Sequence, residues 1–185
     1  MTKEHSLWFA NFRLVIIRTM RASLLVAVVT VVVGNARGDM PLPRPSKIIA
    51  VSPNGAIRAV SDPNSGTRVE DVKQGKVLWC LPDWIRSMRV ADDGEHLVTE
   101  SDGMNLIPPD FTNDFVLLRF WRDGKKIREI KVRDLFPDHR GLVRTVSHYA
   151  WRQHMELDAR GLLHVSLLDG KTLLFDVTTG TFVKA

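Results

Sequence analysis

The chain has 185 residues, of which 44% are hydrophobic and 25% are charged, and its formal net charge is +5 at pH 7. This length is enough for one hydrophobic core and too short for two domains of ordinary size. Five basic residues and one acidic residue lie within 1–38, which leaves 21 basic and 20 acidic residues in 39–185. The excess positive charge therefore belongs mainly to the N-terminal segment, and we expect no nucleic-acid partner for the rest of the chain.

The first 38 residues have the pattern of an export signal. Basic residues precede an apolar run over 22–34, and its thirteen residues suit the core of a signal peptide better than a membrane-spanning helix, which needs about 20 residues. Ala36 and Gly38 place small residues two positions apart, which predicts cleavage before Asp39. We therefore expect an N-terminal hydrophobic signal helix and a mature protein in the periplasm or outside the cell.

Two alternatives for this segment stay open. If it is not cleaved, it becomes a membrane anchor, and the chain then contacts the membrane only through residues 13–34. The stretch before Arg21 is long for the basic part of a signal peptide, so either Met1 or Met20 is the true start. Residues 39–46 follow as a linker in which every second residue from Pro41 to Pro45 is proline, a pattern that favours extended polyproline II structure.

Residues 47–185 repeat one order of strand-like runs and turns three times, over about 47–82, 85–132 and 150–184. The runs are rich in apolar and β-branched residues and have the length of strands. Turns that end in glycine separate them, because glycine adopts positive φ without steric cost. The turn glycines Gly55 and Gly94 lie 39 residues apart.

A period of about 40 residues with four strands in each unit is typical of a propeller blade. The sequence therefore predicts an all-β fold of three four-stranded antiparallel, blade-like meanders. They are expected to form a partial propeller or a flattened sandwich.

Two motifs in these repeats resemble those of a known superfamily. Val51-Ser-Pro-Asn-Gly55, followed by apolar residues, is similar to the turn that opens blades in WD-repeat and periplasmic Tol-type propellers. Leu174–Gly180 resembles the third-strand signature, with Phe175-Asp176 where a Trp-Asp pair often lies. The Gly-His signature is absent, and the second repeat has Trp121-Arg122 in place of Trp-Asp. The resemblance spans about 47–183 and implies a blade-like fold and a binding role, without carrying over any functional residue.

Three blades are too few for a closed propeller, which usually has four to eight. The units could form an incomplete ring or a flattened sandwich, two chains could join into a ring of six, or the domain could dock on a larger partner. Open sheet edges are a template for pairing. We therefore expect a protein partner or self-association.

Two long loops interrupt the repeats, over 100–114 and 133–150, and long loops in compact domains are often functional. Aromatic rings on or near them offer large apolar faces for sugars or extended peptides. The alternative is that most of these aromatic residues pack in the core. The candidate binding residues are Phe111, Trp121, His148, Tyr149 and Trp151.

The sequence offers no motif for a catalytic centre, a metal site or a cofactor. The histidines are scattered, and Cys80 has no second cysteine and follows Trp79 in an apolar run, which favours a small buried residue. No glycine-rich phosphate loop or nucleophile elbow is present.

The leading interpretation is an exported, non-catalytic binding or protein-interaction module of propeller-like repeats. Two alternatives remain open. One is a small secreted hydrolase that uses loop carboxylates or a histidine around 100–150. The other is a membrane-tethered structural protein.

Overall fold

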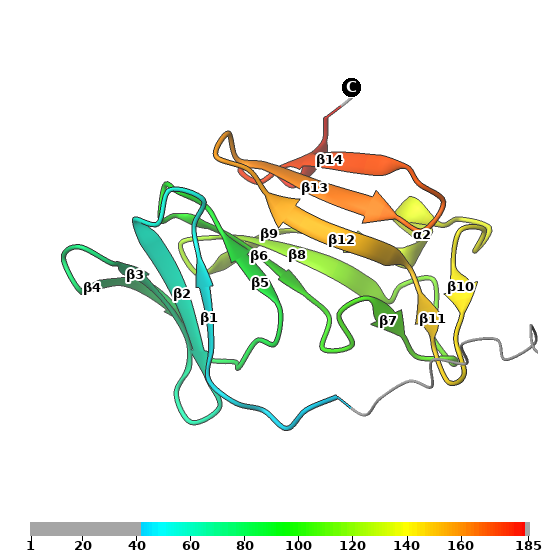
Figure 1. Ribbon diagram of the computed structural model, residues 1–185, viewed down its shortest axis with the longest axis horizontal. Coiled ribbons are helices and arrows are strands. Elements are labelled where there is room, and N and C mark those ends of the chain that lie inside the picture. The colour runs from blue at the N-terminus through cyan, green and yellow to red at the C-terminus, as the bar shows by residue number, and fades with distance from the viewer. Residues whose placement is uncertain (1–41, 184–185) are drawn as a thin grey trace, which may run out of the picture. The chain divides into compact units, whose positions relative to one another are not determined.

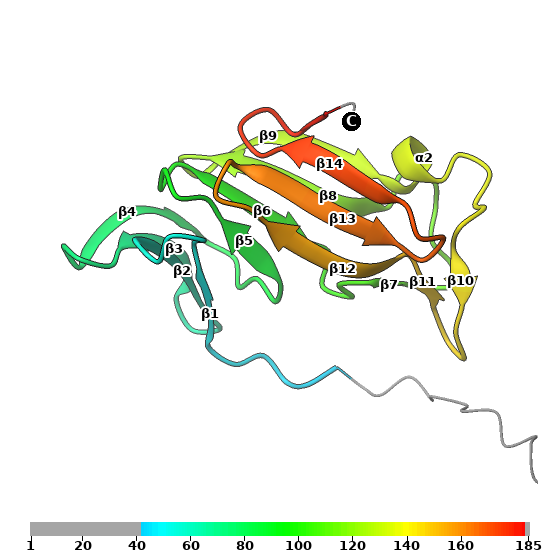
Figure 2. The ribbon, with the colours of Figure 1, turned by 45° about the horizontal axis from the view of Figure 1, so that its top comes forward.

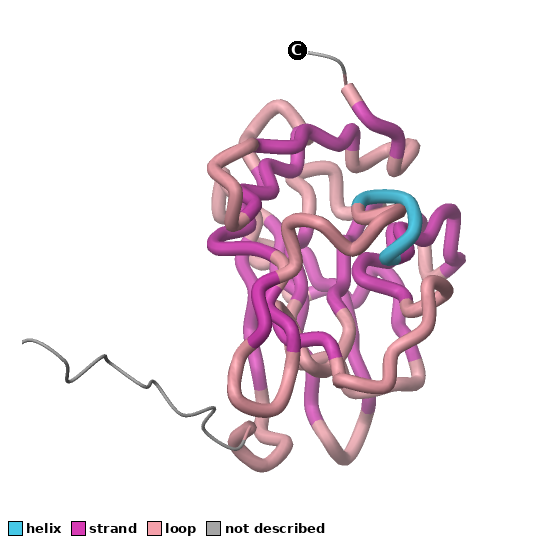
Figure 3. Tube along the Cα trace, turned by 90° about the vertical axis from the view of Figure 1, so that its right-hand side faces the viewer, coloured by secondary structure: helices cyan, strands magenta, loops and turns pink. Residues whose placement is uncertain are grey.

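The computed structural model describes residues 42–183. The predicted signal segment, its cleavage site and the first three residues of the proline-rich linker (39–41) lie outside the described residues. Within 42–183 the chain is almost entirely β structure, with four antiparallel sheets and one helical turn (Figures 1 and 3). The prediction of an all-β antiparallel fold is therefore confirmed. No helix among these residues has the length and apolar character needed to cross a membrane.

Three of the sheets have four strands each, and their strands lie in chain order. The first sheet contains β1 (Ile48–Val51), β2 (Ile57–Asp62), β3 (Gly66–Asp71) and β4 (Lys76–Leu81). The second sheet contains β5 (Met88–Val90), β6 (His96–Glu100), β8 (Val116–Arg122) and β9 (Lys125–Lys131). The third sheet contains β12 (Arg152–Leu157), β13 (Leu162–Leu167), β14 (Thr172–Asp176) and β15 (Thr181–Phe182).

A small fourth sheet and the helix come from the two long loops. The small sheet has the order β10 (Val143–Arg144), β11 (Tyr149–Ala150) and β7 (Leu106–Ile107). The helix α2 (Val132–Leu135) is a single turn that directly follows β9.

The first turn of each four-stranded sheet closes in the same way. The amide of Ser52 donates to the carbonyl oxygen of Ile57 at 2.9 Å, and the corresponding bonds join Ala91 to His96 at 2.9 Å and Asp158 to Leu162 at 3.0 Å. A glycine with φ between 73° and 77° lies inside each turn, where a side chain would be strained. These bonds define equivalent positions in the three sheets, which the strand registers then extend from strand to strand.

Asp158 stabilises the turn of the third sheet through its carboxylate. Oδ1 accepts hydrogen bonds from the amides of Arg160 and Leu162 at 2.9 and 3.0 Å, and Oδ2 lies 3.1 Å from His164 Nε2. Burial by itself raises the pKa of Asp158, but the hydrogen bonds from Leu162, His164 and Arg160 outweigh it and hold this pKa well below its ordinary value.

The second sheet lies between the first and the third (Figures 1 and 2). One core cluster joins the first and second sheets, and its members include Ile57, Val69, Val90 and Leu97. A larger cluster joins the second and third sheets and also receives residues of the long loops; it includes Phe120, Trp151, Met155, Leu163 and Phe175. The same stacking relation therefore occurs twice along the chain.

The first strand of the second sheet, β5, lies between β1 and β12, the first strands of the other two sheets, and contacts both (Figure 1). The guanidinium of Arg89 on β5 donates to the carbonyl oxygen of Met155 on β12, at 3.0 Å from Nη2 and 3.3 Å from Nε. A cavity of about 300 Å³ lies beside this contact, and its walls include Val51, Arg89 and Glu156 from the three strands.

One expectation about a core residue is wrong. Cys80 is exposed rather than buried. It lies on β4, the edge strand of the first sheet, opposite Arg68 of β3, and both residues lie on the side of the sheet that faces away from the second sheet. Apolar neighbours in sequence suggest a core strand, but Leu81 is the only buried residue of β4.

Candidate functional site

The two long loops, which the sequence indicated as the place to look for a site, form one structure. Tyr149 of β11 lies opposite Ile107 of β7, and Ala150 lies opposite Leu106. Trp151 extends this connection, because its amide donates to Asn105 O at 3.2 Å and its indole Nε1 donates to Met104 O at 3.0 Å. The loops are therefore held together by backbone pairing at their centre.

The structure brings two of the five candidate binding residues into contact. The rings of Phe111 and Tyr149 meet edge to face, with centroids 5.6 Å apart. The guanidinium of Arg144 lies over the Tyr149 ring at 5.5 Å and donates to its hydroxyl oxygen at 3.0 Å. Phe111 also contacts the ring of His139, with centroids 5.1 Å apart. Phe111 and Tyr149 are half-buried, His139 and Arg144 are exposed, and the cluster connects the two loops.

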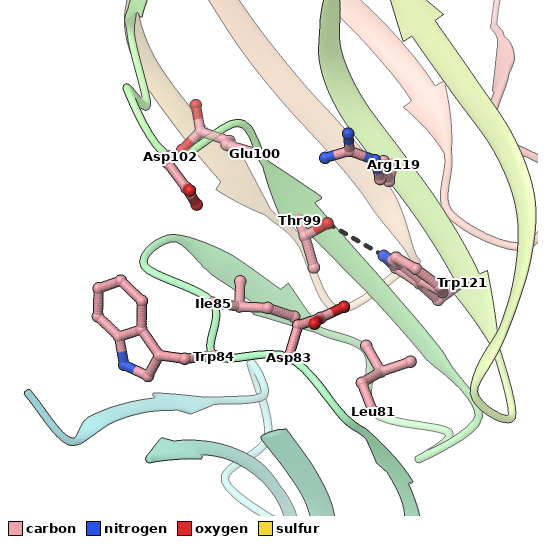
Figure 4. A pocket seen from close by; sticks show the side chains of 9 residues that line it. All are labelled: Leu81, Asp83, Trp84, Ile85, Thr99, Glu100, Asp102, Arg119 and Trp121. Atoms are coloured by element: carbon pink, nitrogen blue, oxygen red, sulfur yellow. Dashed lines mark hydrogen bonds between the residues drawn. The ribbon is translucent and has the colours of Figure 1, made fainter. Parts of the chain in front are cut away.

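The other three candidates lie in different surroundings. His148 lines a cavity of about 520 Å³ beside Leu106 and Phe115. Trp121 packs against the core between the first and second sheets, and its indole donates to Thr99 Oγ1 at 3.0 Å (Figure 4). Trp151 has an exposed fraction of 0%, so it belongs to the core and has no surface that a ligand can reach.

A second cavity, of about 450 Å³, lies between the first and second sheets (Figure 4). Asp83 and Trp84 come from the connection between these sheets, and Arg119 and Trp121 come from β8. Asp102 and Arg119 line both this cavity and the one that contains His148. The two cavities therefore adjoin, and we call them together the groove.

The end of the proline-rich linker is fixed next to this groove. The indole of Trp84 donates to Ser46 O at 2.8 Å, and Arg86 Nη1 donates to Pro43 O at 3.0 Å. The Arg86 guanidinium also lies 4.7 Å from the centre of the Trp84 ring. Leu42 lines the groove itself. Trp84 and Arg86 thus bind a segment of the chain's own backbone, a role that the sequence did not reveal.

The buried acid of the groove has a structural partner. Glu100 has a side chain with 0% exposure and Arg152 has one with 11%. Arg152 Nε and Nη2 donate to the two carboxylate oxygens at 2.6 and 2.7 Å, and Ser87 Oγ donates to the same carboxylate. This pair connects β6 of the second sheet to β12 of the third.

A catalytic pair of acids, as the hydrolase alternative requires, is not seen in residues 42–183. No two carboxyl groups in that range share a hydrogen bond, and the same range holds no cluster of three or more His, Cys, Asp or Glu side chains arranged to bind a metal. The hydrogen bonds of Glu100 with Arg152 and Ser87 contribute to the cohesion of the second and third sheets.

The clearest unusual surface is the side of the first sheet that faces away from the second. We call it the outer face of the first sheet, and no other sheet of the described chain lies against it (Figures 1 and 2). Its apolar members on β1 are Ile49 and Val51, which are 53% and 58% exposed. The equivalent residues are Met88 (2%) and Val90 (1%) in the second sheet and Met155 (1%) and Leu157 (6%) in the third.

Charged residues lie beside these aliphatic side chains. Arg58 Nε donates to Glu70 Oε2 at 2.7 Å, and Arg68 forms a further ion pair with Glu70. Burial raises the pKa of Glu70, but the hydrogen bonds and charges of the two arginines outweigh it and lower this pKa. Arg58 and Glu70 occupy the positions that Leu97 and Trp121 hold in the second sheet, so the outer face is partly apolar and partly charged.

The third sheet also has a side without a covering sheet, which we call the outer face of the third sheet. Its residues are half-buried or exposed, and they include both apolar and acidic side chains. They are His154, Glu156, Leu162, His164, Ser166, Thr172, Leu174 and Asp176.

Comparisons with known proteins give partial likenesses. No family model and no curated protein sequence matches the chain. The chain is similar to the structure of U3-55K, with a TM-score of 0.42 and 11% identity over 78% of this chain and 40% of that one. It is similar to the WD40 repeats of RRP9, with a TM-score of 0.42 and 11% identity over 78% of this chain and 39% of that one. It is similar to HIRA(644–1017), with a TM-score of 0.42 and 14% identity over 69% of this chain and 36% of that one.

The chain therefore spans about two fifths or less of the structures it matches. At these identities no activity or partner is carried over, and the interpretation of function depends on the two outer faces and the groove.

Proposed function

We propose that the chain is an exported, non-catalytic protein-interaction module of propeller-like repeats and that the outer face of the first sheet is its contact surface. The observation that carries the proposal is the exposure of Ile49 and Val51, 53% and 58%, at positions whose equivalents in the other two sheets are at most 6% exposed. The same strand positions are buried in the second and third sheets and exposed in the first sheet. A protein partner against this face would make the three sheets alike.

The physical reason is the cost of apolar surface in water. Burial of apolar surface contributes roughly 25 cal/mol per Å² removed from water, so two adjacent aliphatic side chains on a flat sheet favour a covering partner. Exposed apolar patches with a polar rim are typical of interaction sites, and Arg58, Arg68 and Glu70 form such a rim here.

Export is supported by the signal-like pattern of residues 1–38, with its apolar run over 22–34 and small residues before Asp39. The intact mass of the protein from its native host tests this part. A chain that starts near Asp39 supports export, and a chain that starts at Met1 or Met20 supports the membrane-tethered alternative.

The contact surface is tested by cross-linking in the native envelope fraction. The double variant Ile49→Asp and Val51→Asp is expected to lose the cross-linked product, because carboxylates on this face oppose its burial. Val146→Asp is the matched control, since Val146 is 70% exposed and lies in the loop between β10 and β11, and it should retain the product. Equal products from all three proteins would refute the proposed surface.

A further inference from the structure

We propose that the partner of this surface is a second copy of the same chain and that two copies close a ring of six sheets. In this ring the outer face of the first sheet in one copy packs on the outer face of the third sheet in the other, and this contact occurs twice. The inference rests on the proposed function, because it names the partner of the surface assigned there.

The stacking order within one chain provides the geometric argument. Each contact between consecutive sheets uses the same two sides: Ile57 and Val69 of the first sheet face Val90 and Leu97 of the second. By strand register, the outer face of the third sheet corresponds to the side that carries Ile57 and Val69. The outer face of the first sheet corresponds to the side that carries Val90 and Leu97. The two uncovered faces are therefore the two halves of a contact that the chain already makes twice.

The number of sheets agrees with closure by two copies. Closed propellers have about four to eight blades, so three sheets leave an open arc and two arcs of three make a ring within this range. A ring of two copies has a two-fold axis, and both of its contacts are identical. The strand β5 contacts both β1 and β12, residues of all three strands line one cavity, and these strands would line half of the central channel.

Apolar side chains remain on both faces at matching places. Leu162 corresponds to Ile57, and Leu174 corresponds to Val69, which is 0% exposed within its own contact. Both leucines are only half-buried in the single chain. In the ring they would pack against Ile49 and Val51 of the other copy, as Ile57 and Val69 pack against the second sheet.

The charges of the two faces are complementary. The outer face of the first sheet has two arginines around one glutamate, whereas the outer face of the third has Glu156 and Asp176. Glu156 holds the position of Arg89, whose charged side chain already lies in the contact between the second and third sheets. In the ring, Glu156 would approach Ile49 of the other copy, the counterpart of Met155, on the face that also carries Arg58 and Arg68. In an alternative dimer, in which the outer faces of the two first sheets packed on each other, Arg58 of one copy would instead lie against Arg58 of the other.

Sedimentation equilibrium of the purified protein, at tens of micromolar, tests the proposal. The expected mass is twice the intact chain mass from mass spectrometry. Val51→Asp in the first sheet and Glu156→Arg in the third should each weaken the dimer roughly tenfold or more, because each places a repulsive charge in the contact. Glu156 has a side chain that is 70% exposed, so its replacement is compatible with folding, and Val146→Asp serves as the unaffected control.

A mixture of the two variants separates the ring from other dimers. Val51→Asp damages only the first sheet and Glu156→Arg only the third, so the mixture contains one intact pair of faces and should form a two-chain species that neither variant forms alone. A wild-type dimer that Glu156→Arg does not weaken would overturn the proposed pairing of faces. A mass above two chains would overturn closure of the ring.

A monomeric wild-type protein would overturn the second copy as the partner. The cross-linking experiment then decides the proposed function separately. A product with a different protein that depends on Ile49 and Val51 would leave that function standing, and no product would refute both.

Discussion

Val51 and Val90 offer a test in which one residue type occupies one strand position in two sheets. Val90 is 1% exposed and Val51 is 58% exposed. Replacing Val90 by Ala removes two buried carbon atoms, worth about 1.6 kcal/mol at about 0.8 kcal/mol for each, and the cavity raises the loss to roughly 2–3 kcal/mol. The same change at Val51 removes carbons that are less than half buried and leaves no cavity, so the loss is at most about 0.7 kcal/mol.

Urea unfolding followed by tryptophan fluorescence measures this difference, because Trp79 and Trp121 pack against the core between the first two sheets. The experiment is performed at concentrations where sedimentation gives a single chain, so that association does not contribute to the free energy of unfolding. Equal losses for Val51→Ala and Val90→Ala would mean that the outer face of the first sheet is already covered within one chain. That result would refute the reasoning behind the contact surface.

Three further predictions concern the stability of the folded domain. Glu100→Gln should lower the free energy of unfolding by about 3 kcal/mol or more, because it leaves the guanidinium of Arg152 buried without its carboxylate. A loss below about 1 kcal/mol in urea unfolding, which is what an exposed ion pair contributes to stability, would contradict this. Gly66→Ala should destabilise the chain far more than Gly75→Ala in thermal unfolding. Both glycines have positive φ, but a Cβ at Gly66 would lie 2.5 Å from a backbone carbonyl oxygen, whereas a Cβ at Gly75 meets nothing within 4 Å. Equal losses of stability would show that the strand ends next to Gly66 can move apart. The pKa of Asp158 is lower in the folded than in the unfolded chain, so its stabilisation is complete above about pH 5 and is lost as pH falls further. Asp158→Asn should therefore flatten the decline of the urea midpoint between about pH 5 and pH 2, and an unchanged decline would assign the acid sensitivity to other groups.

The sequence was sufficient to predict the class of fold, because turn chemistry and strand-length apolar runs are local properties. Gly55, Gly94 and Gly161 have the positive φ that their turns require. The pairing of the long loops is not local. β7 and β11 have two residues each and lie about forty residues apart in the chain, so neither has a periodic pattern that identifies its partner.

Side-chain surroundings were harder to predict than strands. Aromatic residues have the same chemistry in a groove and in a core, and only the structure separates Trp151, which is fully buried, from Tyr149, which is half-buried. Cys80 was expected in the core because its neighbours are apolar, but an edge strand exposes one side even when its composition is apolar. The exposure of Ile49 and Val51 is invisible in sequence for the same reason, since their pattern is that of a core strand.

The Glu100–Arg152 pair also has no signal in the sequence. The two residues lie 52 positions apart and are brought together only when the third sheet stacks on the second. Trp84 and Arg86 are similar, because the backbone atoms that they bind precede them by about forty residues. Contacts between sheets depend on how the meanders stack, and the order of strands within one meander does not determine it.

Carbene footprinting of Ile49 and Val51 tests most directly whether a partner covers the outer face of the first sheet. The labelling of these two residues is measured in the native envelope fraction and again in the purified protein at high dilution, and each value is divided by that of Val146. If a partner covers the outer face of the first sheet, the relative labelling should be lower in the envelope fraction and should rise on dilution, whatever the partner is. Relative labelling that is equal in both samples would contradict the central claim, because the face would then be as open to solvent in its native setting as it is in the isolated chain.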